Sequence, residues 1–342
     1  MEGPEGRREL NAKNVILATG SEARLLPGIE PDPDRILTNI EILELAAIPH
    51  SLGIIGAGAV GGEFASIFRR FGSEVTILEM LPRLVPLEDE EVSHELARAF
   101  RKQGITAHTG ARVDKVEKRE GCVEVGFQDA AGKAQTLSVE KLLVAVGRQP
   151  NTANLCLENT AIKTDRGFVP VDPYMATAEP GVYAIGDIVA ASPQLAHVAS
   201  MEGLVAVGRI AEKDVRPVNY RRIPGCTYCE PQIGSVGFTE AEARAAGYAV
   251  KVGKVPFAAN SKASILGAHG GFVKVVAEEK YGEILGAHII GPSATELIAE
   301  MVTALEAEAT VETMIATIHA HPTLAEAMGE AFNAVYGLSI HG

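Results

Sequence analysis

Three glycines spaced as Gly56-Ala-Gly58-Ala-Val-Gly61 constrain the fold of this chain more than any other feature. An apolar run that predicts a strand comes directly before them, and an apolar repeat typical of a helix comes directly after. Gly56 permits a tight turn, Gly58 lets the backbone approach a pyrophosphate, and Gly61 lets the helix pack closely on the strand. The pattern therefore predicts a βαβ unit with a dinucleotide phosphate at the helix N-terminus.

An acid closes the second strand predicted for this unit, Glu74–Glu79. At that place Glu79 can accept hydrogen bonds from the adenosine ribose hydroxyls, and it repels the 2′-phosphate of NADP. The sequence therefore predicts binding of NAD. The alternative, a glycine-rich turn that only packs a helix on a sheet, is disfavoured because spacing, flanking elements and acid agree. The residues predicted to contact NAD here are Gly56, Ala57, Gly58, Ala59, Val60, Gly61, Gly62 and Glu79.

Composition argues against several classes of protein. The formal net charge of −13 disfavours nucleic-acid binding, which depends on clustered Lys and Arg. The sequence has no run of about 20 apolar residues that could span a membrane, and its first residues lack the apolar run of a signal peptide. Four cysteines in 342 residues do not make a disulfide framework. We therefore expect a cytoplasmic protein that binds neither nucleic acid nor a membrane.

The length of 342 residues predicts two or three domains. The apolar run Asn14–Gly20 predicts a strand entering a turn, as at the end of a domain whose first part is absent. Pro27, Pro31 and Pro33 predict a linker, with a new domain from about Thr38. The expected segments are 1–37, 38–150, 151–219 and 220–342, of which the last is strand-rich and then helical, hence α+β.

Val92, Leu96 and Phe100 repeat on one face of a predicted helix. Glu88 and Asp89 open it and are expected to be surface acids that balance the helix dipole. Strands and helices alternate from residue 51 onward, which predicts a doubly wound α/β domain. Strands are expected near 51–56, 74–79, 105–108, 112–118, 122–127, 139–146 and 181–187, and helices near 60–71, 88–103, 196–211, 294–307, 311–318 and 324–336.

Motifs along almost the whole chain resemble those of the pyridine nucleotide–disulfide oxidoreductases, most closely their dihydrolipoamide dehydrogenase branch. These motifs are Val15–Ser21, Gly56–Glu63, Val146–Asn151, Tyr183–Asp187, Leu195–His197 and His319–Glu326. The resemblance implies that 1–37 and 151–219 are the remnant of an FAD-binding Rossmann-like domain. It implies that 38–150 bind NAD and that 220–342 form a dimerisation domain, so that a homodimer uses both FAD and NAD.

The resemblance also implies which residues contact the cofactors. FAD contacts are expected at a turn after a strand, at an acid that binds the ribityl and phosphate region, and beside the isoalloxazine ring. These residues are, in that order, Ala18, Thr19 and Gly20, then Asp187, then Gln194, Leu195, Ala196 and His197. Glu63 and Gly147 match nicotinamide-side contacts of NAD, and Val113 matches an adenine-side contact.

His321 and Glu326 match the acid/base pair of the family. A dithiol that reduces a disulfide must first lose a proton to form the attacking thiolate, and histidine titrates near neutral pH. A carboxylate bonded to the ring fixes its tautomer and favours the imidazolium. In the family this histidine reaches the flavin–disulfide centre of the other subunit, which again implies a homodimer.

Two alternatives remain for this segment. Thr323-x-x-Glu326 fits a capping box, so Glu326 could instead serve only a helix N-terminus. His319 and His321 could suggest a metal site, but no Cys or acid cluster surrounds them in the sequence, so no metal is expected. We expect His319 to be structural.

The sequence contains no C-x-x-x-x-C redox pair, and its one G-x-G-x-x-G unit of this kind is the NAD unit. Cys226-Thr-Tyr-Cys229 is a C-x-x-C, but it precedes Pro231 in a strand-like context, so we expect it to be structural rather than redox-active. Three explanations stay open for the missing redox pair and the missing FAD glycine motif. They are a truncated gene model, a split subunit completed by a separate FAD-domain chain, and a degenerate fragment.

The implied activity is oxidation of dihydrolipoamide to lipoamide with NAD⁺, through FAD, on a lipoyl-bearing acyltransferase or another lipoyl protein. One alternative is another NAD(P)H disulfide or quinone reductase of the family, although Glu79 disfavours the NADP that glutathione reductase uses. The other is a non-catalytic NAD-binding dimerisation module. The missing cysteine pair favours such a module, and the presence of both His321 and Glu326 disfavours it.

Overall fold

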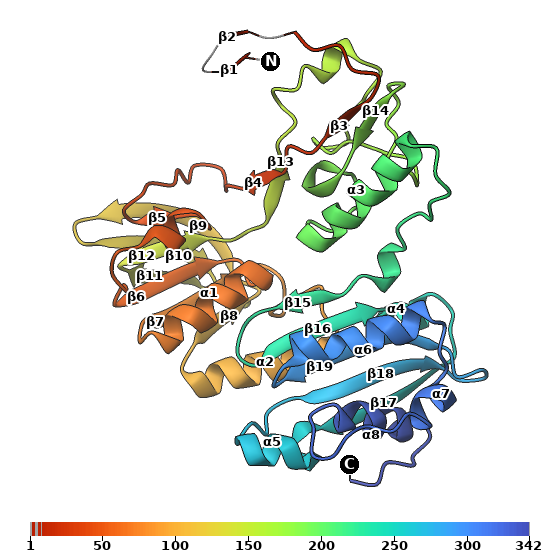
Figure 1. Cartoon of the computed structure of the whole chain (residues 1–342). Coiled ribbons are helices and arrows are strands. Elements are labelled where there is room, and N and C mark those ends of the chain that lie inside the picture. The colour runs from red at the N-terminus through yellow and green to blue at the C-terminus, as the bar shows by residue number, and fades with distance from the viewer. Residues whose placement is uncertain (1, 4–5, 8, 342) are drawn as a thin grey trace. The chain divides into compact units, whose positions relative to one another are not determined.

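The computed structural model describes residues 2–3, 6–7 and 9–341 of the chain, traced from red to blue in Figure 1. The described residues divide into two compact units, each built from two stretches of sequence. The smaller unit lies within Met1–Glu22 and Arg148–Tyr220, and the larger within Ala23–Gly147 and Arg221–Gly342. The nucleotide motif and the C-terminal region thus fold together in the larger unit.

A short parallel sheet forms the centre of the smaller unit. β3 (Val15–Leu17) pairs with β14 (Val182–Ala184), so two segments far apart in sequence lie side by side (Figure 1). Helix α3 (Ala196–Ile210) buries Val198, Val205 and Ala206. The other short elements are β1 (Glu2–Gly3), β2 (Gly6–Arg7), β4 (Ser21–Ala23), β13 (Arg148–Pro150), η2 (Leu157–Asn159), η3 (Gly186–Ile188) and η4 (Tyr220–Arg222).

A parallel sheet in the order β5-β12-β6-β7-β8 confirms the doubly wound fold expected around the glycine motif. Leu52 and Ile54 pack in the core that contains α1 and α2, whereas Ile55 packs in the core of the adjoining antiparallel sheet. A strand covered on both faces needs a continuous apolar run, as this one has. The elements are β5 (Ile36–Leu37), η1 (Glu41–Glu44), β6 (Ser51–Ile55), α1 (Ala59–Arg70), β7 (Glu74–Glu79), α2 (Glu90–Gln103), β8 (Thr106–Thr109) and β12 (Lys141–Val144).

The adjoining antiparallel sheet has the order β11-β10-β9, with β9 at Arg112–Arg119, β10 at Cys122–Gln128 and β11 at Ala134–Val139. The strand expected near 139–146 is confirmed as β12, but the chain turns at Glu140, so Val139 belongs to β11. At this turn the Glu140 N–H donates to Ser51 Oγ on β6 at 2.9 Å. β11 escaped prediction because its residues are mostly polar and alternate between exposed and half-buried positions.

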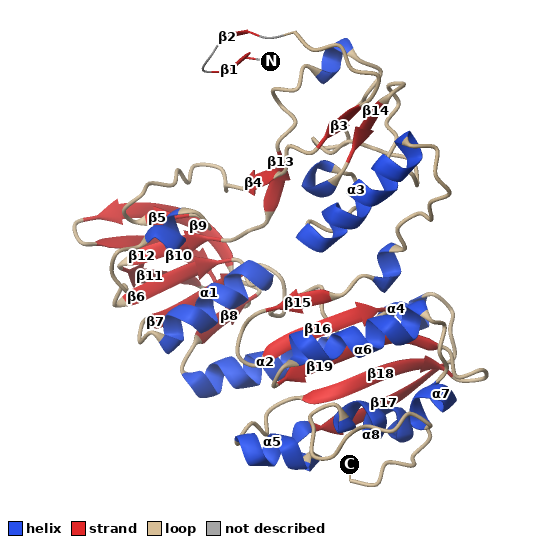
Figure 2. Ribbon diagram, viewed as in Figure 1, coloured by secondary structure: helices blue, strands red, loops and turns tan. Residues whose placement is uncertain are grey.

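The C-terminal region is an antiparallel sheet in the order β15-β16-β19-β18-β17, which confirms the α+β expectation. Every residue of β19 is buried, so both faces of the sheet are covered there. Helix α6 packs on β16 and β19, and α8 packs on β17 and β18 (Figure 2). The elements are β15 (Gly225–Thr227), β16 (Gln232–Gly237), α4 (Glu240–Ala245), β17 (Val250–Pro256), η5 (Phe257–Ala259), α5 (Ser261–Leu266), β18 (Phe272–Glu278), β19 (Ile284–Gly291), α6 (Ala294–Glu306), α7 (Val311–Ile315) and α8 (Glu326–Val335).

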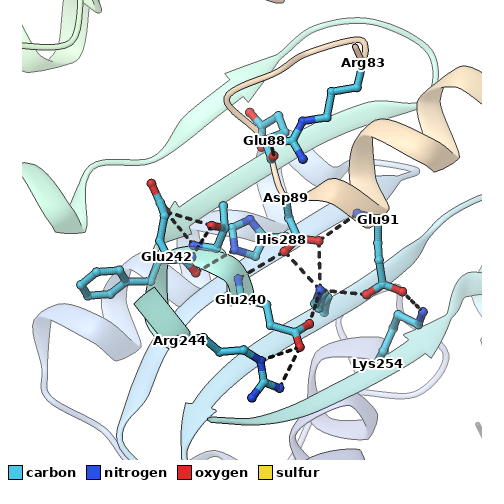
Figure 3. Close-up of polar contacts among 12 residues, drawn as sticks. Arg83, Glu88, Asp89, Glu91, Glu240, Glu242, Arg244, Lys254 and His288 are labelled. Carbon is cyan, nitrogen blue, oxygen red and sulfur yellow. Dashed lines mark hydrogen bonds and ion pairs between the residues drawn. The ribbon is translucent and has the colours of Figure 1, made fainter. Parts of the chain in front are cut away.

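A buried lysine joins the N-terminus of α2 to the C-terminal sheet. The Lys274 side chain on β18 is 2% exposed, and its Nζ lies 3.0 Å from Asp89 Oδ1. Glu91 and Glu240 approach the same ammonium at 2.8 Å each. Figure 3 shows these three acids converging from α2 and α4. Burial opposes ionisation of Asp89, but the hydrogen bonds from Lys274 and the Glu91 N–H, together with nearby positive charge, outweigh burial and hold the pKa of Asp89 below its ordinary value.

This cluster corrects the expectation that Glu88 and Asp89 are surface acids. Asp89 is 2% exposed and is the N-cap of α2, where its side chain accepts from the Glu91 N–H at 3.1 Å. The Glu88 Oε2 atom is also buried, and burial raises the pKa of Glu88 to about 7. Sequence alone did not indicate this burial, because the residue that covers Asp89 lies 185 positions away.

Candidate nucleotide sites and acid/base pair

The glycine loop between β6 and α1 has the geometry that a dinucleotide pyrophosphate needs. A Cβ at Gly56 would lie 2.3 Å from the Ala145 carbonyl oxygen, and one at Gly61 would lie 2.0 Å from the Gly56 carbonyl oxygen. Only glycine fits at either position. At Gly58, by contrast, no heavy atom of the described chain lies within 4 Å of a built Cβ, so the backbone faces open space. This open space, at the N-terminus of α1, suits a phosphate.

Glu79 lies beside this loop, with both carboxylate oxygens bonded to backbone. Its Oε2 accepts from the Ala57 N–H at 2.6 Å, and its Oε1 accepts from the Leu81 N–H at 2.7 Å. The residue is buried, so the acid holds the loop in place. Each oxygen keeps a further lone pair for a ribose hydroxyl, and the ligand role of Glu79 stays a prediction.

The other residues predicted to contact NAD lie in different parts of the larger unit. Glu63, on α1, accepts from the Tyr228 N–H at 2.8 Å, and burial raises the pKa of its carboxyl. Gly147 adopts φ 111° and accepts from the Arg24 N–H at 3.0 Å. Val113, on β9, is half-buried against the core of the antiparallel sheet. The nucleotide contacts assigned to these three residues remain predictions.

In the smaller unit, the turn after β3 is held by Asn151. Thr19 Oγ1 donates to the Asn151 carbonyl at 2.7 Å, and the Asn151 N–H donates to the Gly20 carbonyl at 2.9 Å. Gly20 adopts φ 69°, and a built Cβ meets no heavy atom within 4 Å in the described chain. Ala18, Thr19 and Gly20 therefore form an ordered, open turn of the kind that a flavin nucleotide could approach.

Asp187 lies in η3, close to this turn within the same unit. Its carboxylate accepts from Ser21 Oγ, and Arg148 Nε lies 3.8 Å from its Oδ2. Gln194 Nε2 donates to the Asp187 carbonyl at 3.3 Å. The segment then passes through Leu195, the N-cap of α3, to the exposed Ala196 and His197.

Sequence reasoning missed Glu202 as a residue that supports this loop. Glu202 lies on α3 and is 0% exposed. Its Oε2 accepts from the Gly186 N–H at 2.6 Å, and its Oε1 accepts from Ser192 Oγ at 2.6 Å and from the Tyr220 hydroxyl at 2.7 Å. The available signal was an isolated acid inside the otherwise apolar stretch 196–207.

The structure brings His321 and Glu326 together. His321 Nδ1 lies 2.9 Å from Glu326 Oε1, and the histidine side chain is 70% exposed. The Thr323 N–H donates to Glu326 Oε2 at 2.8 Å. This Thr323 bond, with the His321 contact, holds the pKa of Glu326 below its ordinary value, so the acid is ionised at neutral pH.

The structure contains one of the two hydrogen bonds that define a capping box. Glu326 accepts from the Thr323 backbone, as a capping box requires, but Thr323 Oγ1 donates to the Ala320 carbonyl at 2.7 Å and does not cap the helix. Helix α8 begins at Glu326 itself, with Ala325 as its N-cap. One oxygen of the Glu326 carboxylate therefore binds the backbone of the turn, and the other binds His321. A contribution to the helix N-terminus and a bond to His321 are thus compatible.

The C-x-x-C segment lies at β15 in a setting that disfavours thiolates. Burial raises the pKa of the Cys226 thiol, and it raises the pKa of the Cys229 thiol to about 12. Cys229 Sγ donates to the Pro231 carbonyl at 3.0 Å. Because the thiolate is the reactive form, this environment supports a structural role for the pair.

Over the part of the chain that the structure describes, no three His, Cys, Asp or Glu side chains gather as a possible metal site.

Within residues 2–3, 6–7 and 9–341, no helix is long and apolar enough to cross a membrane.

Comparison with known families identifies the class. Residues 2–203 match the family described as pyridine nucleotide-disulphide oxidoreductase, and residues 223–332 match its dimerisation domain. The chain belongs to this family of oxidoreductases, which combine a Rossmann-like fold with a C-terminal dimerisation domain and bind nucleotides. The dimerisation-domain match supports a homodimer.

Curated relatives narrow the class to dihydrolipoyl dehydrogenases, whose cofactors are FAD and NAD. The dihydrolipoyl dehydrogenase of Rhizobium etli is 45% identical over 334 residues, which cover 97% of this chain and 69% of the relative. That of Bacillus subtilis is 44% identical over 331 residues, covering 96% of this chain and 69% of the relative. The chain thus spans about seven-tenths of the length of these relatives.

Solved structures agree with this assignment. LpdA from Mycobacterium tuberculosis is 30% identical with a TM-score of 0.89, and the match covers 96% of this chain and 71% of that one. The HOCl-induced flavoprotein disulfide reductase RclA from Escherichia coli, as its Cu(II) complex, is 29% identical with a TM-score of 0.89. That match covers 97% of this chain and 74% of RclA.

Proposed function

We propose that this chain is the NAD-binding and acid/base part of an enzyme that converts dihydrolipoamide and NAD⁺ into lipoamide, NADH and H⁺. The observation that carries the proposal is the 2.9 Å contact between His321 Nδ1 and Glu326 Oε1 on a largely exposed ring. In this reaction the two thiols lose two electrons and two protons, and NAD⁺ takes up both electrons and one proton. A group that accepts a thiol proton near neutral pH is therefore needed.

The contact with Glu326 fixes how His321 would act. An ionised carboxylate can only accept, so Nδ1 must carry the hydrogen and Nε2 keeps its lone pair. Nε2 of an exposed ring can take a proton from a dithiol and leave the thiolate that attacks a disulfide. Glu326 then stabilises the imidazolium. The same pair can return the proton in the reverse direction.

The glycine loop and the turn after β3 supply the cofactor contacts of the proposal. The open side of Gly58 fits a pyrophosphate, and Glu79 favours NAD over NADP by repelling a 2′-phosphate. The open turn at Gly20 and the nearby Asp187 would hold part of the FAD. A bound flavin supplies the two-electron step between the dithiol and the nicotinamide.

The proposal includes a flavin-binding segment with a redox cysteine pair, supplied by a longer form of this chain or by a separate chain. The four cysteines of this sequence do not include a C-x-x-x-x-C. The smaller unit has a surface suited to such a segment, because α3 exposes Met201, Leu204 and Val207. In the described residues β3 pairs with β14 alone. Parallel sheets normally have more strands and are covered on both faces, so a further segment could extend this one.

The proposed substrate is the dihydrolipoyl group of a lipoyl-bearing acyltransferase or another lipoyl protein, because the relatives are dihydrolipoyl dehydrogenases. The proposed location is the cytoplasm. All four cysteines of the chain are free, which fits a reducing compartment.

The test is to mix the purified chain with FAD, lipoamide and NADH, with and without the flavin-binding segment of a relative. We expect NADH binding by the chain alone, and NADH-dependent lipoamide reduction once the segment is present. His321→Gln should remove the turnover and leave NADH binding intact. A chain that binds NADH but stays inactive with the segment would contradict the proposal and support a non-catalytic NAD-binding dimerisation module.

A further inference from the structure

His321 lies on an irregular segment between α7 and α8, and its partner Glu326 is the first residue of α8. A side chain on a loop keeps a fixed geometry only if other residues hold the backbone around it. The His321 ring is 70% exposed, so its own packing does little to orient it. The residues that hold this segment therefore decide whether Nδ1 faces Glu326.

Asn260 holds the segment from one side. Asn260 is 7% exposed and is the N-cap of α5. It lies 63 positions before Thr323 in the sequence. Its Oδ1 accepts from the Ala263 N–H at 2.9 Å, while its Nδ2 donates to the Thr323 carbonyl at 3.0 Å. The Thr323 N–H in turn donates to Glu326 Oε2. One buried amide thus connects a helix cap to the acid that orients His321.

His319 holds the segment from the other side. Its side chain is 11% exposed, and Nε2 donates to Glu300 Oε1 on α6 at 2.8 Å. On its other edge, Nδ1 lies 3.1 Å from where a Cβ would stand at Gly329, on α8. The His319 ring, two residues before His321, therefore packs closely against Gly329.

We propose that Asn260 and His319 are positioning residues that fix the His321–Glu326 pair. Asn260 acts through the Thr323 carbonyl, and His319 acts through its bond to Glu300. The inference rests on the proposed acid/base function of the pair, but it concerns the geometry of the imidazole and is measured without turnover.

The decisive variant is Asn260→Asp. Aspartate keeps the oxygen that caps α5 at Ala263, because it can still accept there. It removes the Nδ2 donor and sets a second acceptor against the Thr323 carbonyl. The matched control is Asn333→Asp on α8, which removes a donor to the Gly329 carbonyl at 2.9 Å but makes no contact with the loop that the structure records.

The measurement is the ¹⁵N spectrum of the histidine rings in the intact, selectively labelled chain, with His321 assigned from His321→Gln. We expect the wild type and Asn333→Asp to show His321 as a single Nδ1–H tautomer. Asn260→Asp should lose that pattern and give the averaged shifts of an exposed, unpaired ring. An unchanged His321 pattern in Asn260→Asp would overturn the proposal for Asn260.

A second pair of variants tests His319 and does not depend on the folding of Asn260→Asp. His319→Gln can still donate to Glu300 and should retain the His321 tautomer, whereas His319→Leu should lose it. Equal His321 spectra in the two variants would overturn the proposal for His319. If the tautomer behaves as expected and turnover still fails, the positioning inference stands and the proposed function does not.

Discussion

Replacing Lys274 with methionine should destabilise the larger unit more than any other single loss of charge described above. Methionine keeps most of the length and apolar volume of the lysine stem, so little packing is lost. Asp89, which is 2% exposed, would then lose the ion pair that the described structure gives it, while Glu91 and Glu240 stay nearby. Removing one partner of a buried ion pair costs about 3–5 kcal/mol.

Lys254→Met provides the matched control. Lys254, on the neighbouring strand β17, also pairs with Glu91, but its side chain is 43% exposed. A pair that exposed contributes at most about 1 kcal/mol. The two substitutions therefore remove the same charge from the same carboxylate neighbourhood and differ in burial.

The assay is urea unfolding followed by far-UV circular dichroism, with hydrogen exchange of the amides of α2 as a local readout. We expect Lys274→Met to lower the free energy of unfolding by about 3–5 kcal/mol and to expose the first turn of α2 to exchange. Asp89→Asn in the Lys274→Met background should restore part of the loss, because it removes the unpaired buried charge. Equal effects of Lys274→Met and Lys254→Met would show that burial of the Lys274–Asp89 pair does not set its contribution to stability.

Three further predictions concern single sites. Burial raises the pKa of Glu88 to about 7, so its stabilising contribution is complete below the ordinary glutamate pKa and is lost as the pH rises through about 7. Glu88→Gln should therefore raise the urea midpoint at pH 8 and change it little near pH 4.5. The gain in the free energy of unfolding at pH 8 has an upper bound of about 3 kcal/mol, from roughly 1.4 kcal/mol per pKa unit. An equal effect at both pH values would contradict this. Gly58→Val should fold normally, because a Cβ there meets open space, yet weaken NADH binding in calorimetry by at least about tenfold, or 1.4 kcal/mol; unchanged affinity would argue against a phosphate at the loop. Cys229, whose thiol pKa is raised to about 12, should resist iodoacetamide at pH 8 while exposed Cys156 reacts, as mass spectrometry can show. Rapid alkylation of Cys229 in the folded chain would contradict its burial.

The nucleotide-binding half of the larger unit was predictable because its signals are local. The glycine spacing, the apolar strand before it and the acid at Glu79 all lie within one βαβ unit. The His321–Glu326 contact was predictable for the same reason, since both residues belong to one short motif. In each case the sequence neighbours are also the spatial neighbours.

Residues with distant partners were not predictable in this way. In the sequence Asp89 has the pattern of an ordinary acid at a helix start. Its burial depends on its partner Lys274, which lies 185 positions away. Asn260 and Glu202 likewise gain their roles from segments that only the fold brings close. A polar residue can be buried when the fold brings it a hydrogen-bond or ion-pair partner, and local sequence periodicity does not indicate that partner.

The short elements of the C-terminal region form a third case. α4 and α5 have only 6 residues each, too few for a helical repeat to appear in the sequence. Their helices are instead defined by caps, with Thr239 and Glu242 forming a capping box in α4 and Asn260 capping α5. A capping signal of this kind is visible in the sequence as Thr239-x-x-Glu242, but a cap alone does not give the length of the helix.

The proposed acid/base role of His321 is tested by NADH formation from dihydrolipoamide and NAD⁺. The chain is supplied with FAD and with the flavin-binding, dithiol-bearing segment of a relative. We expect the activity to fall by about 10²–10⁴-fold in His321→Gln, the range expected for loss of an acid/base group. His319→Gln should retain most of that activity. Turnover that is the same in His321→Gln as in the wild type would show that His321 is not the acid/base group.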